Sequence, residues 1–155
     1  MSVIIHDKSP KTYIVLGSPS GGTSFIAKSI HEMGIDMGKL EQGPRRYEDQ
    51  NFAKFFSKAR QTKKFDIKKL KSLIKNKSFW GFKNVEAAFS LKPMLKYFKD
   101  DVYLVCVFRR PSKVARSIAR PPSRFATEED ALKEAKAYYQ GIIDIIQHFL
   151  SNELG

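Results

Sequence analysis

A short segment rich in glycine and serine, residues 17–24, has the composition of a loop that holds a phosphate group. An apolar run precedes it, and apolar side chains at helical spacing follow it. In a strand, loop and helix in this order, backbone N–H groups and the positive end of the helix converge on an anion. A tight turn whose glycines meet only steric needs is the alternative, and the loop alone leaves both open.

The same loop matches the P-loop pattern of nucleotide-binding proteins at Gly17 and Gly22, but it carries Thr23 where that pattern has lysine. That lysine makes the main contact to the β- and γ-phosphates of a nucleoside triphosphate. The most apolar later segment, residues 102–108, also ends at Arg109 instead of the aspartate that a Mg²⁺ site requires. A phosphotransferase is therefore the least favoured function, and no metal is expected.

A second cluster of charge follows that apolar segment, because residues 109–124 contain six basic residues and no acidic one. Arg109 at the end of a strand would offer a planar fork to phosphate oxygens. Ser117, about two turns into a helix that Pro111 can open, could turn its hydroxyl to the same oxygens. The alternative is that Arg109 pairs with a surface carboxylate, which the absence of nearby acids disfavours.

At these two places the sequence resembles the sulfotransferases that use 3′-phosphoadenosine 5′-phosphosulfate (PAPS). Residues 13–25, YIVLGSPSGGTSF, are similar to the loop that binds the 5′-phosphosulfate in that family. Residues 107–118, VFRRPSKVARSI, are similar to the motif that binds the 3′-phosphate, in which a serine stands eight positions after an arginine. Two segments between them, residues 47–49 and 80–83, also look like parts of bacterial and viral-type members.

The resemblance implies that the protein transfers a sulfuryl group from PAPS to a hydroxyl or amine of a small-molecule or glycan acceptor, without a metal. Phe25 matches a position that stacks on adenine in some members, and a phenylalanine of the core is the alternative interpretation. The residues that the resemblance assigns to the cofactor are Ser20, Gly21, Gly22, Thr23, Ser24, Phe25, Arg109 and Ser117.

The loop departs from the family pattern at Ser20, where members carry lysine or arginine, and at Gly21, where they carry serine or threonine. The missing basic side chain stabilises charge on the leaving phosphate oxygen during transfer. Lys83 and Lys28 are the candidates to replace it, and a position in the first helix favours a solvated role for Lys28. The alternative is a domain that binds a nucleotide or another polyanion and has lost the chemistry.

Transfer also requires a base that takes the proton of the acceptor. Glu48 is the first candidate, because acidic residues in this region serve as base in some lineages that the sequence resembles. His31 is the alternative, although its place in a helix favours a packing or surface role. Asp49 is predicted instead to cap the helix that starts near Asn51.

The elements that must position these residues alternate between strand and helix, which predicts one α/β domain over residues 1–155. A three-layer α/β/α architecture around a central parallel sheet is expected, with ligand at the carboxyl ends of the strands. The resemblance implies the P-loop NTPase-like form of this architecture that sulfotransferases have.

The individual elements follow from apolar spacing and caps. The segment 102–108 is continuously apolar, as a strand buried on both faces of a parallel sheet must be. Strands are also expected at residues 13–17 and 79–82. Helices are expected at residues 23–33, 51–60 and 111–119. Three more helices are expected to begin at the cap Asp66, at Pro93 and at the cap Thr127. The last helix is expected to bury Leu132, Ala135, Tyr139, Ile142, Ile146 and Phe149.

The formal net charge is +12 over 155 residues, and 42% of them are hydrophobic, which excludes a disordered chain. Ten basic residues and one acid lie at 54–77, and their helical spacing favours a solvated surface over binding of nucleic acid. The one cysteine, Cys106, excludes an intrachain disulfide and a cysteine zinc site. Since no apolar run could cross a membrane and no signal-peptide pattern opens the chain, we expect a cytoplasmic protein without a membrane partner.

Overall fold

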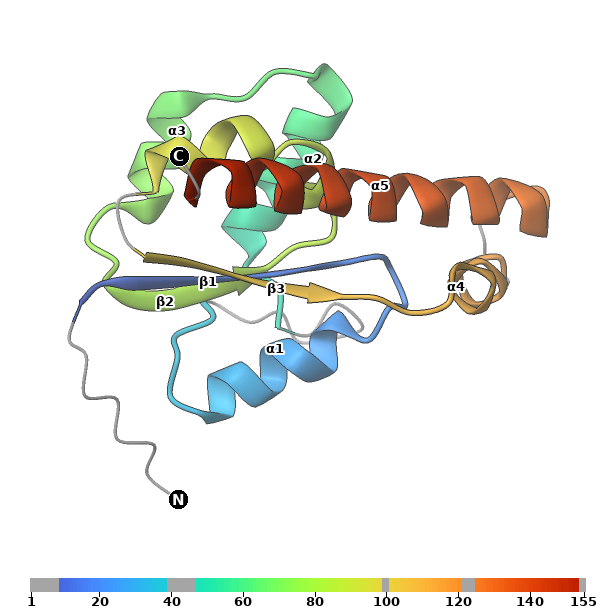
Figure 1. Ribbon diagram of the computed structural model, residues 1–155, viewed down its shortest axis with the longest axis horizontal. Coiled ribbons are helices and arrows are strands. Elements are labelled where there is room, and N and C mark those ends of the chain that lie inside the picture. Colours follow the sequence, from blue (N-terminus) through green and yellow to red (C-terminus); the bar gives the residue numbers. More distant parts are fainter. Residues whose placement is uncertain (1–8, 39–46, 99–100, 121–124, 154–155) are drawn as a thin grey trace.

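A computed structural model describes residues 9–38, 47–98, 101–120 and 125–153 of the chain. Within them an open three-stranded parallel sheet has the strand order β2-β1-β3, and helices lie against it (Figure 1). The strands are β1 (Lys11–Gly17), β2 (Phe79–Lys83) and β3 (Asp101–Val107). The helices are α1 (Thr23–Glu32), α2 (Gln50–Thr62), α3 (Ile67–Ile74), α4 (Pro111–Ile118) and α5 (Glu128–Glu153), with two short 3₁₀ helices, η1 (Glu86–Phe89) and η2 (Lys92–Tyr97).

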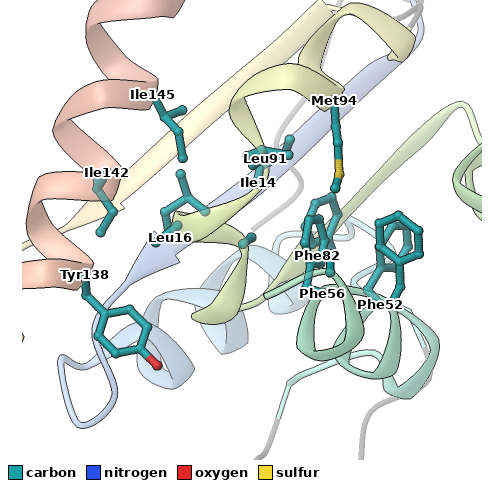
Figure 2. Close-up of a cluster of buried hydrophobic side chains, with 14 of the residues drawn as sticks. Ile14, Leu16, Phe52, Phe56, Phe82, Leu91, Met94, Tyr138, Ile142 and Ile145 are labelled. Carbon is teal, nitrogen blue, oxygen red and sulfur yellow. The ribbon is translucent and has the colours of Figure 1, made fainter. Parts of the chain in front are cut away.

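The sheet separates two layers of helices, which confirms the predicted α/β class. In Figure 1 α1 lies on one face of the sheet, and α2, α3 and α5 lie on the other. The central strand β1 is fully buried at Ile14, Val15 and Leu16. Val15 packs into a cluster with α1, whereas the side chains of Ile14 and Leu16 join the larger cluster, where Figure 2 shows them near Leu91 and Ile142.

An aromatic stack holds α2 against β2. The rings of Phe52 and Phe82 lie 4.4 Å apart and are almost parallel, with 2° between their planes. The ring of Phe56 stacks on Phe82 at 5.6 Å, and all three side chains are buried. This packing fixes the start of α2 beside the carboxyl end of β2, where candidate site residues lie.

Side-chain caps begin three helices, as the sequence predicts. Asp49 accepts hydrogen bonds from two N–H groups in the first turn of α2, at 2.8 and 3.2 Å. Asp66 accepts the N–H of Lys69 at 3.0 Å at the start of α3. The hydroxyl of Thr127 accepts the N–H of Asp130 at 3.1 Å and donates to its carboxylate at 2.8 Å. Each cap satisfies N–H groups that have no partner inside the helix.

The structure corrects the prediction that residues 102–108 form a strand buried on both faces. β3 lies at an edge of the sheet, none of its side chains is fully buried, and Tyr103 is 44% exposed. The residues of β3 are apolar because they contact the helices on both faces of the sheet. A strand at the edge of the sheet makes such contacts as a central strand does, so the apolar run does not distinguish the two positions. Val102, Leu104 and Cys106 pack on the larger cluster, and Val105 and Val107 pack on the smaller one.

The buried face of α5 also differs from the predicted one. Leu132, Ile146 and Phe149 are only partly buried. A Cβ at Gly141 would overlap the carbonyl oxygen of Ala88, so this glycine lets α5 approach η1 and sets its rotation. Ala135, Tyr139 and Ile142 are buried as predicted, and Ala131, Tyr138 and Ile145 are buried beside them.

The segment from Pro93 was predicted as a helix, and it forms the 3₁₀ helix η2. Pro93 lies in its first turn, as expected. Met94 is fully buried there, and Figure 2 shows its side chain reaching toward Phe82. The short helix therefore helps to close the aromatic core.

We expect Phe82→Ala to destabilise the protein by about 3–5 kcal/mol, because it removes a fully buried ring from the stack and leaves a cavity. Phe25→Ala removes the same atoms from a ring that is 72% exposed, and it should change stability by less than about 0.5 kcal/mol. Urea unfolding followed by circular dichroism measures both. Equal losses in the two variants would contradict this packing.

Candidate functional site

The loop between β1 and α1 contains two glycines in close contact with neighbouring atoms and two left-handed residues, Ser20 and Gly22. A Cβ at Gly17 would overlap the methyl group of Thr23, and one at Gly21 would lie 2.8 Å from the carbonyl oxygen of Ser18. Gly22 precedes α1 with a φ of 97°, a conformation that favours glycine, and provides no side-chain cap. No side chain therefore caps the first turn of α1, whose N-terminus is the positive end of the helix dipole.

Hydrogen bonds join this loop to the arginine motif after β3. Arg109 Nη1 donates to the carbonyl oxygen of Ser20 at 2.9 Å, across 89 positions of sequence. The buried hydroxyl of Tyr139 on α5 accepts from the Ser18 hydroxyl at 3.2 Å and from the Arg109 N–H at 3.0 Å. It donates to the Arg109 carbonyl oxygen at 2.6 Å. One phenol thus holds together the segments that follow β1 and β3.

Both motifs line one pocket of about 1000 Å³. The segments that follow the carboxyl ends of all three strands contribute to it, where ligands bind in open parallel sheets. Its volume is in the range of small-molecule sites. All but two of the predicted site residues line it: Ser20, Gly21, Gly22, Thr23, Ser24, Glu48, Lys83, Arg109 and Ser117.

Glu48 and Lys83 form a buried ion pair in the lining of this pocket. Lys83 Nζ lies 3.6 Å from Glu48 Oε2, and the two side chains are 6% and 8% exposed. Asn84 Nδ2 donates to Glu48 Oε1 at 2.7 Å, and Asn84 Oδ1 accepts the N–H of Ala87 at 3.0 Å. Sequence reasoning missed Asn84, although a polar residue directly after a buried strand is the signal that could have found it.

A second polar network reaches the pocket through Glu86 and Tyr138. The guanidinium of Arg60 donates to the Glu86 carboxylate at 2.6 Å, to the Tyr138 hydroxyl at 2.8 Å and to the Glu134 carboxylate at 2.7 Å. The Tyr138 hydroxyl donates to the other oxygen of Glu86 at 2.8 Å. None of these residues was predicted, because they come from three elements far apart in sequence.

The environment of this network shifts two pKa values. Burial and the nearby Glu86 carboxylate raise the pKa of Tyr138, so its hydroxyl keeps its proton at neutral pH and donates to Glu86. Burial lowers the pKa of Arg60, but hydrogen bonds to Glu134 and Glu86 more than offset this, and the net pKa lies above the ordinary value. Arg60 therefore stays charged and Tyr138 stays protonated across physiological pH.

Two predicted site residues lie outside the pocket lining. Phe25 is 72% exposed, so its alternative interpretation as a core phenylalanine is wrong. His31 lies in the last turn of α1, with its ring 6.1 Å from that of Tyr47. Lys28 pairs with Glu32 at 3.5 Å on an exposed surface, which confirms the solvated role predicted for it.

Comparison of the chain with protein-family models, with curated proteins and with solved structures finds no match. Among the described residues, no group of three or more His, Cys, Asp or Glu side chains is arranged to hold a metal ion. No helix in the same residues combines the length and the apolar character that crossing a membrane requires. The pocket and its lining are therefore the basis for proposing a function.

Tyr139→Phe should lower the free energy of unfolding by about 1–3 kcal/mol, because the Ser18 hydroxyl and the Arg109 backbone lose a buried partner. Tyr103→Phe removes the same hydroxyl from a half-exposed residue and should change stability by less than about 0.5 kcal/mol. Urea denaturation of both variants measures the difference. If the two losses are alike, the Tyr139 hydroxyl does not hold the two motifs together.

Proposed function

We propose that this protein transfers a sulfuryl group from PAPS to a hydroxyl or amine of a small-molecule or glycan acceptor. One observation carries the proposal: the two segments that resemble phosphate-binding motifs of PAPS-dependent sulfotransferases line the same pocket. The hydrogen bond from Arg109 to Ser20 joins them directly. The P-loop-like sulfotransferase architecture is part of the proposal, supported by the position of β1 and its loop beside β3.

The cofactor would lie with its two charged ends on the two motifs. The backbone from Ser20 to Ser24 and the positive end of α1 would hold the 5′-phosphosulfate. The Arg109 guanidinium and the Ser117 hydroxyl would hold the 3′-phosphate through charge-assisted hydrogen bonds. Arg120 also lines the pocket and adds positive charge to this part of it. Phe25 lies outside the lining, so the proposal gives it no contact with adenine.

Glu48 is the proposed base, because it is the acidic residue of the pocket lining that the sequence predicts for this role. As the acceptor oxygen or nitrogen attacks sulfur, Glu48 takes the proton of that group. The bond between sulfur and the 5′-phosphate oxygen breaks in line, and its electron pair stays on adenosine 3′,5′-bisphosphate. The products are the sulfated acceptor, the bisphosphate and a protonated Glu48, which returns its proton to solvent.

Lys83 is proposed to supply the positive charge that Ser20 cannot. Lys83 lines the pocket at the end of β2, and its ammonium group lies 3.6 Å from Glu48 Oε2. A fixed cation in a partly buried site stabilises charge that develops on a leaving oxygen. Base and cation would thus be oriented by each other and by the hydrogen bond from Asn84 to Glu48.

A second candidate function is binding of a polyanion without chemistry, and a groove of about 610 Å³ between α2 and α3 favours it. Four lysines from both helices and their connection line this groove: Lys54, Lys58, Lys64 and Lys69. In the described part of the chain, none of their ammonium groups pairs with a carboxylate. The lysines predicted as a solvated helix face therefore belong in part to a concave basic surface.

Nucleic acid remains the less favoured occupant of this groove. The Phe55 side chain is buried, and the ring of Phe65 packs edge-on against Tyr97 at 6.4 Å. Single-stranded nucleic acid usually stacks its bases on exposed aromatic faces. The described residues of the groove therefore offer positive charge to a polyanion but no exposed aromatic face on which bases could stack.

Adenosine 3′,5′-bisphosphate should stabilise the protein against heat more than ATP with Mg²⁺ or a DNA oligonucleotide does. At about 100 times Kd the stabilisation is about 2.7 kcal/mol. Arg109→Ala should weaken binding about tenfold to a hundredfold, because charge-assisted hydrogen bonds are lost. Arg116→Ala is the matched control, since Arg116 lies on the exposed face of α4 outside the pocket. Thermal unfolding over a ligand titration measures these effects.

Two results of that titration would contradict the proposed PAPS site. Equal stabilisation by ATP with Mg²⁺ would contradict a PAPS site. Stabilisation by the DNA oligonucleotide with no response to the bisphosphate would favour the second candidate function.

Transfer of labelled sulfuryl groups from PAPS to a panel of hydroxyl and amine acceptors tests the chemistry. Glu48→Gln should lower kcat by about 10²–10⁴-fold, and Lys83→Met by about 10²–10³-fold. Glu32→Gln on the exposed face of α1 and His31→Ala outside the pocket should keep the native rate. Selective binding of the bisphosphate without transfer to any acceptor would favour a binding protein over an enzyme.

A further inference from the structure

The two edges of the sheet differ in what covers them. On the outer side of β2, Asp36 forms a parallel bridge with Trp80, and the N–H of Gly81 donates to the Asp36 carbonyl oxygen at 2.8 Å. The strand is buried at four of its five positions. On the outer side of β3, the described residues contain no bridge or strand, and β3 pairs with β1 alone.

This uncovered edge has the sequence of an interior strand. Residues 102–108, VYLVCVF, contain no charged residue, proline or glycine. Natural edge strands are usually protected by such residues, by a bulge or by short length. β3 has seven residues and pairs with β1 over all of them in one unbroken register. Tyr103 is 44% exposed and Phe108 is 52% exposed, so the edge is a template for a further strand.

The charges at the two ends of β3 indicate which strand could pair with this edge. Asp101 begins the strand, Arg109 and Arg110 follow it, and all three residues are exposed. If two copies of β3 lie antiparallel about Val105, Asp101 of each copy lies opposite Arg109 of the other, on the same face of the joined sheet. The uncharged residues 102–108 of the two copies then lie opposite one another, with Val105 at the two-fold axis. A parallel pair of copies would instead set Asp101 against Asp101, which is unfavourable.

We propose that two copies of this chain pair along β3, antiparallel about a two-fold axis, so that their sheets join into one. The same surface is used on both copies, so the contact closes at a dimer and does not propagate into a fibre. Backbone hydrogen bonds between the two strands supply affinity, and the ion pairs at both ends set the direction and register. The observations behind this proposal do not involve sulfuryl transfer, although Arg109 belongs to both surfaces.

Size-exclusion chromatography with light scattering and sedimentation velocity test it on the full chain. The native protein should have twice the chain mass of 17.7 kDa. Asp101→Lys sets a lysine opposite Arg109 of the other copy, and Tyr103→Lys places a charge in the middle of the uncharged edge. Each should raise the dimer dissociation constant by about tenfold or more. Leu150→Lys, the matched control on the 53% exposed Leu150 of α5, should leave the dimer intact.

A charge exchange makes the test specific for the antiparallel register. The double variant Asp101→Lys with Arg109→Glu should regain the dimer, since each new lysine would lie opposite a new glutamate on the same face of the joined sheet. Far-ultraviolet circular dichroism checks that every variant is folded. A native protein that is monomeric up to about 100 μM would overturn the proposal. So would a dimer that Tyr103→Lys leaves unchanged, or a double variant no tighter than Asp101→Lys alone. None of these outcomes bears on PAPS binding.

Discussion

The pocket depends on the three hydrogen bonds of the Tyr139 hydroxyl. This group accepts two hydrogen bonds and donates one, which uses all of its capacity. It therefore fixes the distance between the loop that follows β1 and the segment at Arg109, and it anchors both to α5. Because β1 and β3 are neighbouring parallel strands, their carboxyl ends already lie side by side, and the phenol completes an alignment that the sheet begins.

The sequence predicts best those features that depend on residues close to one another along the chain. The loop from Gly17 to Ser24, the caps Asp49 and Asp66 and the arginine motif at Arg109 all have local signals. A cap needs one side chain and the next few N–H groups, and a left-handed glycine needs only its own backbone. These are the parts of the fold and the site that sequence patterns locate well.

Features that depend on how distant elements pack together cannot be predicted from local sequence patterns. Arg60, Glu86 and Tyr138 meet from α2, η1 and α5, and no spacing in the sequence links them. The apolar pattern of β3 indicates contact with two helical layers, which a strand at the edge of the sheet has as well as a central one. The rotation of α5 follows from the close approach of Gly141 to Ala88, which only the packed structure reveals.

The hydrogen bond from Arg109 to Ser20 also affects the thermodynamics of any ligand in the pocket. One N–H of a planar, five-donor guanidinium is fixed by the loop, so the orientation of the other four donors is restricted in advance. Ordering a free side chain of this length on binding costs about 0.5–1.5 kcal/mol. Part of that entropy is lost here when the chain folds. The loop and the arginine therefore act as one preorganised unit, and the stability of the fold sets part of the affinity of the pocket.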